Sequence, residues 1–120
     1  GLFDHVLANE GMFNNKLQGL VGQHPCVKEV RGAGYFYAIE LCTNRHNGQE
    51  LSETQAAGLQ GGILGGLVRQ ERMTIRPDDR GYTGLTISPP LIADQTVIDD
   101  LVERTDRVLT QTTAWLSKNA

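Results

Sequence analysis

The chain has 120 residues and a formal net charge of -3, with 14 acidic and 11 basic side chains. This length supports one small domain with a single core. The basic residues are scattered, which argues against a nucleic-acid binder, because phosphate binding needs clustered lysines and arginines. Two cysteines suggest neither a zinc site nor a disulfide framework, and no segment has the ~18 apolar residues that cross a bilayer. We therefore expect a soluble, cytoplasmic protein with reduced thiols.

The first predicted element is an amphipathic helix over residues 2–20. Its apolar residues recur at helical spacing, and most polar residues lie elsewhere on the helix. Gly11 should loosen this helix, and Gly22, followed by Pro25, predicts its end. The predicted apolar stripe consists of Leu2, Val6, Phe13, Leu17 and Leu20.

Two strands are predicted next, over residues 27–31 and 35–42, with a pair of glycines marking the turn between them. The second strand is largely apolar on both faces, which is typical of the middle of a small sheet. Its Glu40 then needs a partner, because an unpaired buried carboxylate costs several kcal/mol. Arg31 is a candidate partner, although a solvated charge at the end of the strand is the interpretation we favour for Arg31.

A polar loop over residues 43–51 precedes a helix that Ser52 caps and that should run to about Arg72. Interior glycines cost roughly 1 kcal/mol each relative to alanine, so packing must hold this helix together. A phosphate-binding loop is excluded, because no Lys-Ser or Lys-Thr follows the glycines. Close packing of the helix backbone, or a partly broken helix, is the favoured interpretation of Gly58, Gly61, Gly62, Gly65 and Gly66.

The central feature is a predicted hairpin over residues 73–91. A strand over 73–76 leads into a turn dense in Pro, Asp, Arg and Gly, and a second strand over 85–88 ends at Pro89 and Pro90. We expect Arg76 at the point where the first strand ends. A guanidinium there is held by a rigid element yet reaches outward, which suits two-point binding of a carboxylate.

The last predicted element is a helix over residues 95–116, with Asp94 as its N-cap. Its acidic pair, Asp99 and Asp100, should be solvated and favourable to the helix dipole. The expected buried stripe consists of Ile98, Leu101, Val102, Val108, Leu109, Trp115 and Leu116.

Two segments of the sequence resemble a known family. The order Ile-Arg, polar turn, apolar strand and Ser-Pro-Pro-Leu-Ile at 75–92 resembles the C-terminal domain of the class III pyridoxal-phosphate-dependent aminotransferases, the omega-transaminase group of the fold type I enzymes. Arg-Gly-Ala-Gly-Tyr-Phe-Tyr-Ala-Ile-Glu-Leu at 31–41 resembles an earlier segment of the same domain. With the helical regions in the expected order, the resemblance covers nearly the whole chain.

The resemblance implies a small α/β fold of the α+β type. We expect an antiparallel sheet of three to four strands with helices packed on one face. Residues 1–22 would form the helix that links to a missing large domain, and residues 23–120 would form the small C-terminal domain. An apolar face of that first helix would then be uncovered, so we expect the isolated chain to self-associate.

The resemblance also implies a function for the full-length protein. It would be a homodimer that uses pyridoxal 5'-phosphate to move an amino group between an amine or amino acid and a keto acid. In the family that the chain resembles, the lysine that holds the cofactor as a Schiff base belongs to the large domain, and Lys16, Lys28 and Lys118 of this chain all lack a suitable setting. No residue of this chain is therefore expected to be catalytic or to bind the cofactor, and the chain alone should be inactive.

Recognition of the substrate is what this chain could contribute. Arg76 matches the family position that grips a substrate carboxylate, and Arg80 is a rival in the same motif. The structural alternative is an ion pair between Arg76 and Asp78 or Asp79 across the turn. We expect His5, His24 and His46 to be solvated side chains without a catalytic role.

Two other functions stay open from the sequence. A class III relative that decarboxylates or isomerises amino acids would use the same domain. A free-standing interaction module without a cofactor is the alternative from another class of protein.

Overall fold

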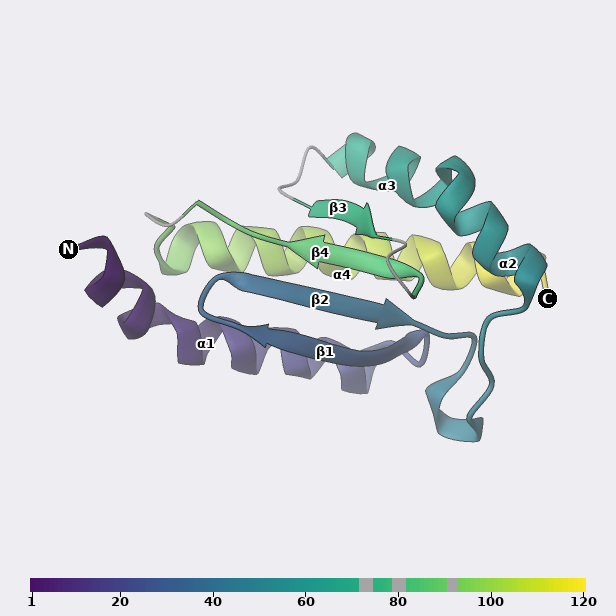
Figure 1. Cartoon of the computed structure of the whole chain (residues 1–120), viewed down its shortest axis with the longest axis horizontal. Coiled ribbons are helices and arrows are strands. Elements are labelled where there is room, and N and C mark those ends of the chain that lie inside the picture. The colour runs from purple at the N-terminus through teal and green to yellow at the C-terminus, as the bar shows by residue number, and fades with distance from the viewer. Residues whose placement is uncertain (72–74, 79–81, 91–92) are drawn as a thin grey trace.

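The computed structural model in Figure 1 describes residues 1–71, 75–78, 82–90 and 93–120. Helices and strands alternate irregularly along the chain, and the two termini lie at opposite ends of the molecule. In chain order the elements are α1 (Leu2–Gln23), β1 (Val27–Ala33), β2 (Phe36–Leu41), a 3-10 turn η1 (Arg45–Asn47), α2 (Glu53–Gly58), a π-helical turn η2 (Leu59–Ile63), α3 (Leu64–Glu71), β3 (Ile75–Asp78), β4 (Gly84–Ile87) and α4 (Gln95–Lys118).

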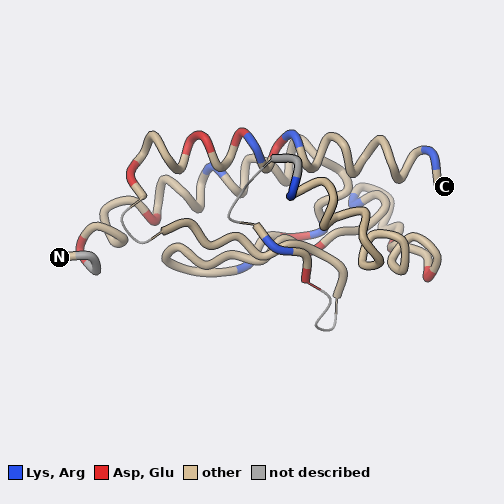
Figure 2. The backbone as a smooth tube through the Cα atoms, turned by 90° about the horizontal axis from the view of Figure 1, so that it is seen from above, with Lys and Arg blue, Asp and Glu red and all other residues tan. Residues whose placement is uncertain are grey.

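In the described part of the chain, four strands form one antiparallel sheet in the order β1-β2-β4-β3. Helices α1 and α4 lie along one face of this sheet, as the edge-on view of Figure 2 shows. The α2–α3 segment runs beside the β3 edge (Figure 1) and contacts both β3 and α4. The predicted fold, a small antiparallel sheet with helices on one face, is confirmed.

The core lies between the sheet and the two long helices. Strand β2 is central, as predicted, and alternate residues turn toward the helices, so that Tyr37, Ile39 and Leu41 are buried. From α1, the ring of Phe13 meets the rings of Tyr35 and Tyr37 edge to face, at 5.9 and 5.1 Å between centroids. Fully buried side chains of the other elements complete the core: Leu17, Leu59, Leu64, Leu85, Ile87, Ile98, Val108 and Leu109.

Helix α1 is longer than the sequence predicted, because neither Gly11 nor Gly22 interrupts it. The helix ends where His24 takes an extended conformation, with φ -125° and ψ 100°. A residue that precedes proline is disfavoured in helical geometry, so Pro25 sets this end.

The segment after the polar loop is a broken helix, which is one of the two interpretations the sequence left open. Ser52 accepts a hydrogen bond from the Gln55 amide and forms a capping box, as expected for the N-cap. The break falls at η2, where Gly62 has φ 136°, a conformation that favours glycine. Close packing also occurs here, since a methyl group on Gly58 would lie 2.8 Å from the Trp115 ring.

Helix α4 begins as predicted, with the Asp94 carboxylate accepting a hydrogen bond from the Val97 amide. Its buried stripe differs in part from the prediction, because Val102 and Trp115 are half-buried. Thr105 and Thr112 are fully buried in the same stripe instead. Their hydroxyls donate to the carbonyl oxygens four residues earlier, which satisfies the polar atoms inside the core.

The hairpin is displaced from its predicted position. Strand β3 runs from Ile75 to Asp78, so Arg76 lies inside the strand and not at its end. Pro77 was interpreted as the start of the turn, but an edge strand tolerates a proline whose missing N–H faces outward. Residues 79–81, including Arg80, lie outside the described residues.

None of the helices in the described ranges combines the length with the apolar character that crossing a membrane would require.

Candidate functional site

The face of the sheet turned away from α1 and α4 carries the candidate site. Ile75 and Ile87 are buried toward the helices, so their neighbours Arg76 and Thr86 belong to the opposite face. Neighbouring strands pair Thr86 with Ala38 and Ala38 with Arg31, so these residues form one row across the same face. No helix among the described residues covers this surface, which we call the open face.

Arg76 is exposed on the open face. Within the described residues its guanidinium forms no ion pair, although Asp78 stands two residues further along the same strand. The predicted alternative of an Arg76–Asp78 pair is therefore wrong. The proposed rival Arg80 and the other suggested partner, Asp79, fall outside the described residues.

The opposite edge of the open face holds an ion-pair cluster. The Arg31 guanidinium donates to the carboxylate of Glu29 and, at 2.7 Å, to that of Glu40. The Lys28 ammonium group lies 3.5 Å from Glu40 and 2.7 Å from Glu50. The favoured expectation of a solvated Arg31 is wrong, and the Arg31–Glu40 pair that was the lesser alternative is present. The antiparallel register brings the two residues to neighbouring positions of β1 and β2.

The charges of this cluster shift the ionisation of its members. The hydrogen bond from Arg31 lowers the pKa of the Glu40 carboxyl below its ordinary value. Burial is the next-largest influence and opposes this shift, and the positive charges of Lys28 and Arg31 add to the lowering. Glu29 and then Glu40 raise the pKa of the Arg31 guanidinium in return. Both groups are therefore charged at neutral pH, so this edge of the open face is an ordered arrangement of charges.

Tyr82 connects the ion-pair cluster to the strand of Arg76. The Arg31 guanidinium carbon lies over the Tyr82 ring, 5.0 Å from its centroid, in a cation–π contact. The Tyr82 hydroxyl donates to Asp78 at 2.8 Å. Asp78 is only 9% exposed. It bonds the Tyr82 hydroxyl, and it lines a pocket together with Gln60, Leu64 and Pro77.

Gly84 allows the Tyr82 ring to lie close to the sheet. A methyl group at position 84 would come within 2.8 Å of the ring atom Cε2 and within 2.0 Å of the Ile39 carbonyl oxygen. Neither contact is tolerable, so this position requires a residue without a side chain. Neither Tyr82 nor Gly84 was predicted from the sequence. The pattern that could have indicated them is an aromatic residue followed two positions later by a glycine at the start of a strand.

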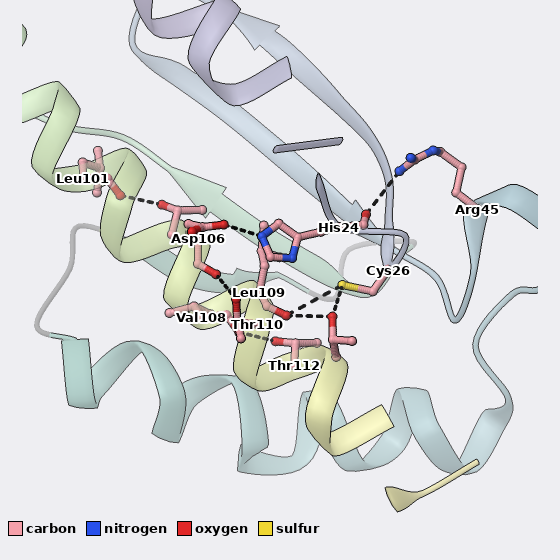
Figure 3. Close-up of polar contacts among 11 residues, drawn as sticks. His24, Cys26, Arg45, Leu101, Asp106, Val108, Leu109, Thr110 and Thr112 are labelled. Carbon is pink, nitrogen blue, oxygen red and sulfur yellow. Dashed lines mark hydrogen bonds and ion pairs between the residues drawn. The ribbon is translucent and has the colours of Figure 1, made fainter. Parts of the chain in front are cut away.

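A second polar cluster lies behind the sheet, at the end of α1 (Figure 3). His24 is 8% exposed, and its Nε2 makes a short contact with the Asp106 carboxylate of α4. Arg45 donates to the carbonyl oxygens of His24, at 3.2 Å, and Val27, at 2.8 Å. Nearby, burial raises the pKa of the Cys26 thiol, which disfavours the reactive thiolate. The cluster joins α1, β1, η1 and α4, and we interpret it as structural.

Two of the three histidines differ from the prediction. His24 is buried and paired, and His5 lies 2.8 Å from the Ala93 carbonyl oxygen, so neither is a solvated side chain. His46 is exposed, as expected. The partner of His24 lies 82 positions away, and no local pattern in the sequence indicates it.

The lysines of this chain do not fit the role of a residue that holds a pyridoxal cofactor. Such a lysine needs a sheltered site that depresses its pKa. Lys16 pairs with Asp99 at 2.7 Å on the helix side, and hydrogen bonding to Glu50 raises the pKa of Lys28. Lys118 stands exposed in the last turn of α4.

Two further types of site find little support. A groove of about 510 Å³ runs between α3 and α4, but its apolar walls present few polar groups that could orient a small molecule. Among the described residues, no cluster of three His, Cys, Asp or Glu side chains could hold a metal ion. The residues that line the groove are Gly62, Ile63, Gly66, Leu67, Gln111, Ala114, Trp115 and Lys118.

Comparison with known sequences finds aminotransferases. No family model matches the chain. A protein of Mycobacterium tuberculosis named "probable aminotransferase Rv3329" is 34% identical over 112 residues, which cover 93% of this chain and 24% of that protein. The taurine–pyruvate aminotransferase of Bilophila wadsworthia is 31% identical over 98 residues, 78% of this chain and 20% of that enzyme. The chain thus spans a quarter or less of the length of these relatives.

Comparison with solved structures finds the same fold. The omega-transaminase from Pseudomonas jessenii, in complex with PMP, superposes with a TM-score of 0.77 at 29% identity. The superposition covers 99% of this chain and 25% of that one. Sequence and fold therefore both match aminotransferases over nearly the whole of the present chain.

Proposed function

We propose, on the premise that this chain is an aminotransferase domain of class III, that its open face recognises the substrate carboxylate. The predicted resemblance is confirmed by the matches in sequence and in fold. The whole protein would be a homodimeric cytoplasmic enzyme that moves an amino group between an amine or amino acid and a keto acid. Residues 1–22 would link this domain, residues 23–120, to a large domain.

Pyridoxal 5'-phosphate would supply the chemistry of amino transfer, and residues outside this chain would bind it. The neighbour from Pseudomonas jessenii contains PMP, the amino form of that cofactor. Because the three lysines of this chain do not fit covalent attachment, the domain would contribute recognition and no catalytic group. The chain alone should then be inactive.

Arg76 carries the proposal for the site. Arg76 presents an exposed guanidinium on a strand, and this group has no ion-pair partner among the described residues. It can donate two hydrogen bonds to the oxygens of one carboxylate. A charged hydrogen bond of this kind contributes ~1.5–3 kcal/mol. Arg80 stays the alternative residue for the same role. The relative from Bilophila wadsworthia is named for pyruvate, a keto acid whose carboxylate such a site would bind.

Substitution of Arg76 in the full-length enzyme tests this proposal. We expect Arg76→Ala to raise KM for a keto acid about tenfold or more, and to change KM for an amine without a carboxylate much less. Arg107→Ala removes a guanidinium from the outer side of α4, near Glu103, and should change neither value. Equal losses for both substrates would show that Arg76 is structural.

Kinetic measurements on the full-length enzyme would separate this proposal from the other class III activities. Steady-state kinetics with two substrates should give parallel double-reciprocal lines for amino transfer. Release of carbon dioxide would instead indicate a decarboxylase. An interaction module without a cofactor would show neither activity in the full-length protein.

A further inference from the structure

The described contacts of the strand that carries Arg76 come mainly from β4 and α3. Strand β3 has four residues, lies at the edge of the sheet and pairs only with β4 among the described strands. Pro77 has no N–H group, so it cannot donate a backbone hydrogen bond. On its other side β3 meets α3, where Pro77 lies about 4.0 Å from a methyl group placed on Gly65. The direction of Arg76 therefore depends on how the end of β3 is fixed.

Tyr82 fixes that end from the open face. Its hydroxyl donates to Oδ2 of Asp78, the last residue of β3 and the second after Arg76. The contact spans four positions and joins β3 to the segment that leads into β4. Because successive side chains alternate across a strand, Asp78 and Arg76 emerge on the same face.

The Tyr82 ring is in turn held by the centre of the sheet. Gly84 leaves the space in which the ring lies, and the Arg31 guanidinium packs over the ring at 5.0 Å. Arg31 is itself fixed by hydrogen bonds to Glu29 and Glu40. A continuous series of contacts therefore runs from β1 and β2, across the ring, to the carboxylate beside Arg76.

We propose that Tyr82 is a positioning residue that orients Arg76 for a substrate carboxylate, through its hydrogen bond to Asp78. The inference rests on the proposed role of Arg76 in carboxylate recognition. It adds that selectivity for keto acids depends on a hydroxyl that does not itself touch the substrate. A bidentate contact needs accurate geometry, and a displacement of about 1 Å can reduce the rate of a reaction by a factor on the order of 100.

The test is Tyr82→Phe in the full-length holoenzyme, which removes the hydroxyl and keeps the ring under Arg31. We expect a rise of roughly tenfold in KM for pyruvate and little change for an amine without a carboxylate. The matched control is Tyr35→Phe, which removes a buried hydroxyl that donates to the Ala93 carbonyl oxygen at 2.7 Å. This control should lower stability without changing the ratio of the two KM values.

A double variant separates positioning from general damage. If Tyr82 acts through Arg76, Tyr82→Phe should add almost nothing to KM for pyruvate once Arg76 is alanine. A selective effect of Arg76→Ala together with an unchanged ratio in Tyr82→Phe overturns the inference and leaves the proposed function standing. An unchanged ratio in Arg76→Ala overturns both. Additive effects in the double variant also overturn the inference.

Discussion

The two faces of the sheet differ in what their side chains do. The covered face presents Tyr37, Ile39, Leu85 and Ile87 to the helices, and all four are buried. The open face presents charges and small side chains from all four strands, including Arg31, Ala38, Thr86 and Arg76. Because successive residues of one strand serve different faces, stability and recognition are encoded in alternate positions of the same short segments.

The contrast between the two faces predicts which positions tolerate substitution. A buried apolar side chain contributes through its removal from water and its packing, and both are lost when it is shortened. A polar side chain on the open face contributes little to folding unless other groups depend on its position. Substitutions at adjacent positions should therefore separate into effects on stability and effects on substrate selectivity.

The largest effect on stability is expected for Ile39→Ala. Ile39 is fully buried at the centre of the sheet, between β1 and β4. Shortening such a side chain costs about 2–5 kcal/mol, because the cavity it leaves closes only in part. Urea denaturation of the chain in dilute solution, followed by circular dichroism, measures the free energy of unfolding.

The matched control for Ile39 is Thr86→Ala on the other face. Thr86 is half-buried between Ala38 and Arg76, and we expect its substitution to cost below about 1 kcal/mol. Comparable losses at both positions would mean that the open face also belongs to a core, and the contrast between the faces would not hold.

An intermediate effect on stability is expected for Gly84→Ala, because the added methyl group clashes both with the neighbouring strand β2 and with the Tyr82 ring. The new methyl group would meet the Ile39 carbonyl oxygen at 2.0 Å and the Tyr82 ring at 2.8 Å. Overpacking of this kind costs about 1–3 kcal/mol. In the full-length enzyme, displacement of the ring should also raise KM for keto acids if Tyr82 positions Arg76.

Gly61→Ala is the control for Gly84. A methyl group at position 61 meets no other atom within 4 Å, and the residue lies in a helical segment where alanine is favoured. We expect a neutral or slightly stabilising change. Similar destabilisation at both glycines would argue against the close contact at Gly84.

The parts of the fold that the sequence predicted depend on local signals. The capping residues Ser52 and Asp94 are followed by helices because their side chains bond amides only three residues ahead. The apolar character of residues 35–42 on both faces identified the central strand, because a strand in the middle of a small sheet is covered on both sides. The strand around Arg76 was also predicted, although two residues too early, and the role of Arg76 comes from the resemblance and stays a prediction.

The parts that it did not predict depend on register and on distant partners. Arg31 meets Glu40 only because β1 and β2 pair in one particular register, and the bond between Tyr82 and Asp78 depends on the pairing of β3 with β4. Pro77 was predicted to end the strand. A proline is tolerated inside β3 because β3 lies at the edge of the sheet, and the sequence does not show which strand is the edge. A sequence read locally contains neither the strand order nor the register.

The smallest effect concerns the Glu40–Arg31 pair, and its dependence on pH has a definite sign. Because the folded state lowers the pKa of Glu40 below 4.5, the carboxylate favours folding at neutral pH. This contribution is complete above that ordinary value and is lost as the pH falls through the lowered pKa of the folded state. We expect the stability difference between the unchanged chain and Glu40→Gln to be below about 1 kcal/mol at pH 7, because the pair is partly solvated.

That difference should shrink as the pH is lowered past the ordinary glutamate range, and it should also shrink in high salt, which screens exposed charges. Urea denaturation at several pH values measures the effect. A difference that grew toward acid pH would mean that the folded state stabilises the protonated form of Glu40. The pKa of Glu40 would then be raised by folding and not lowered, which would contradict its ion pair with Arg31.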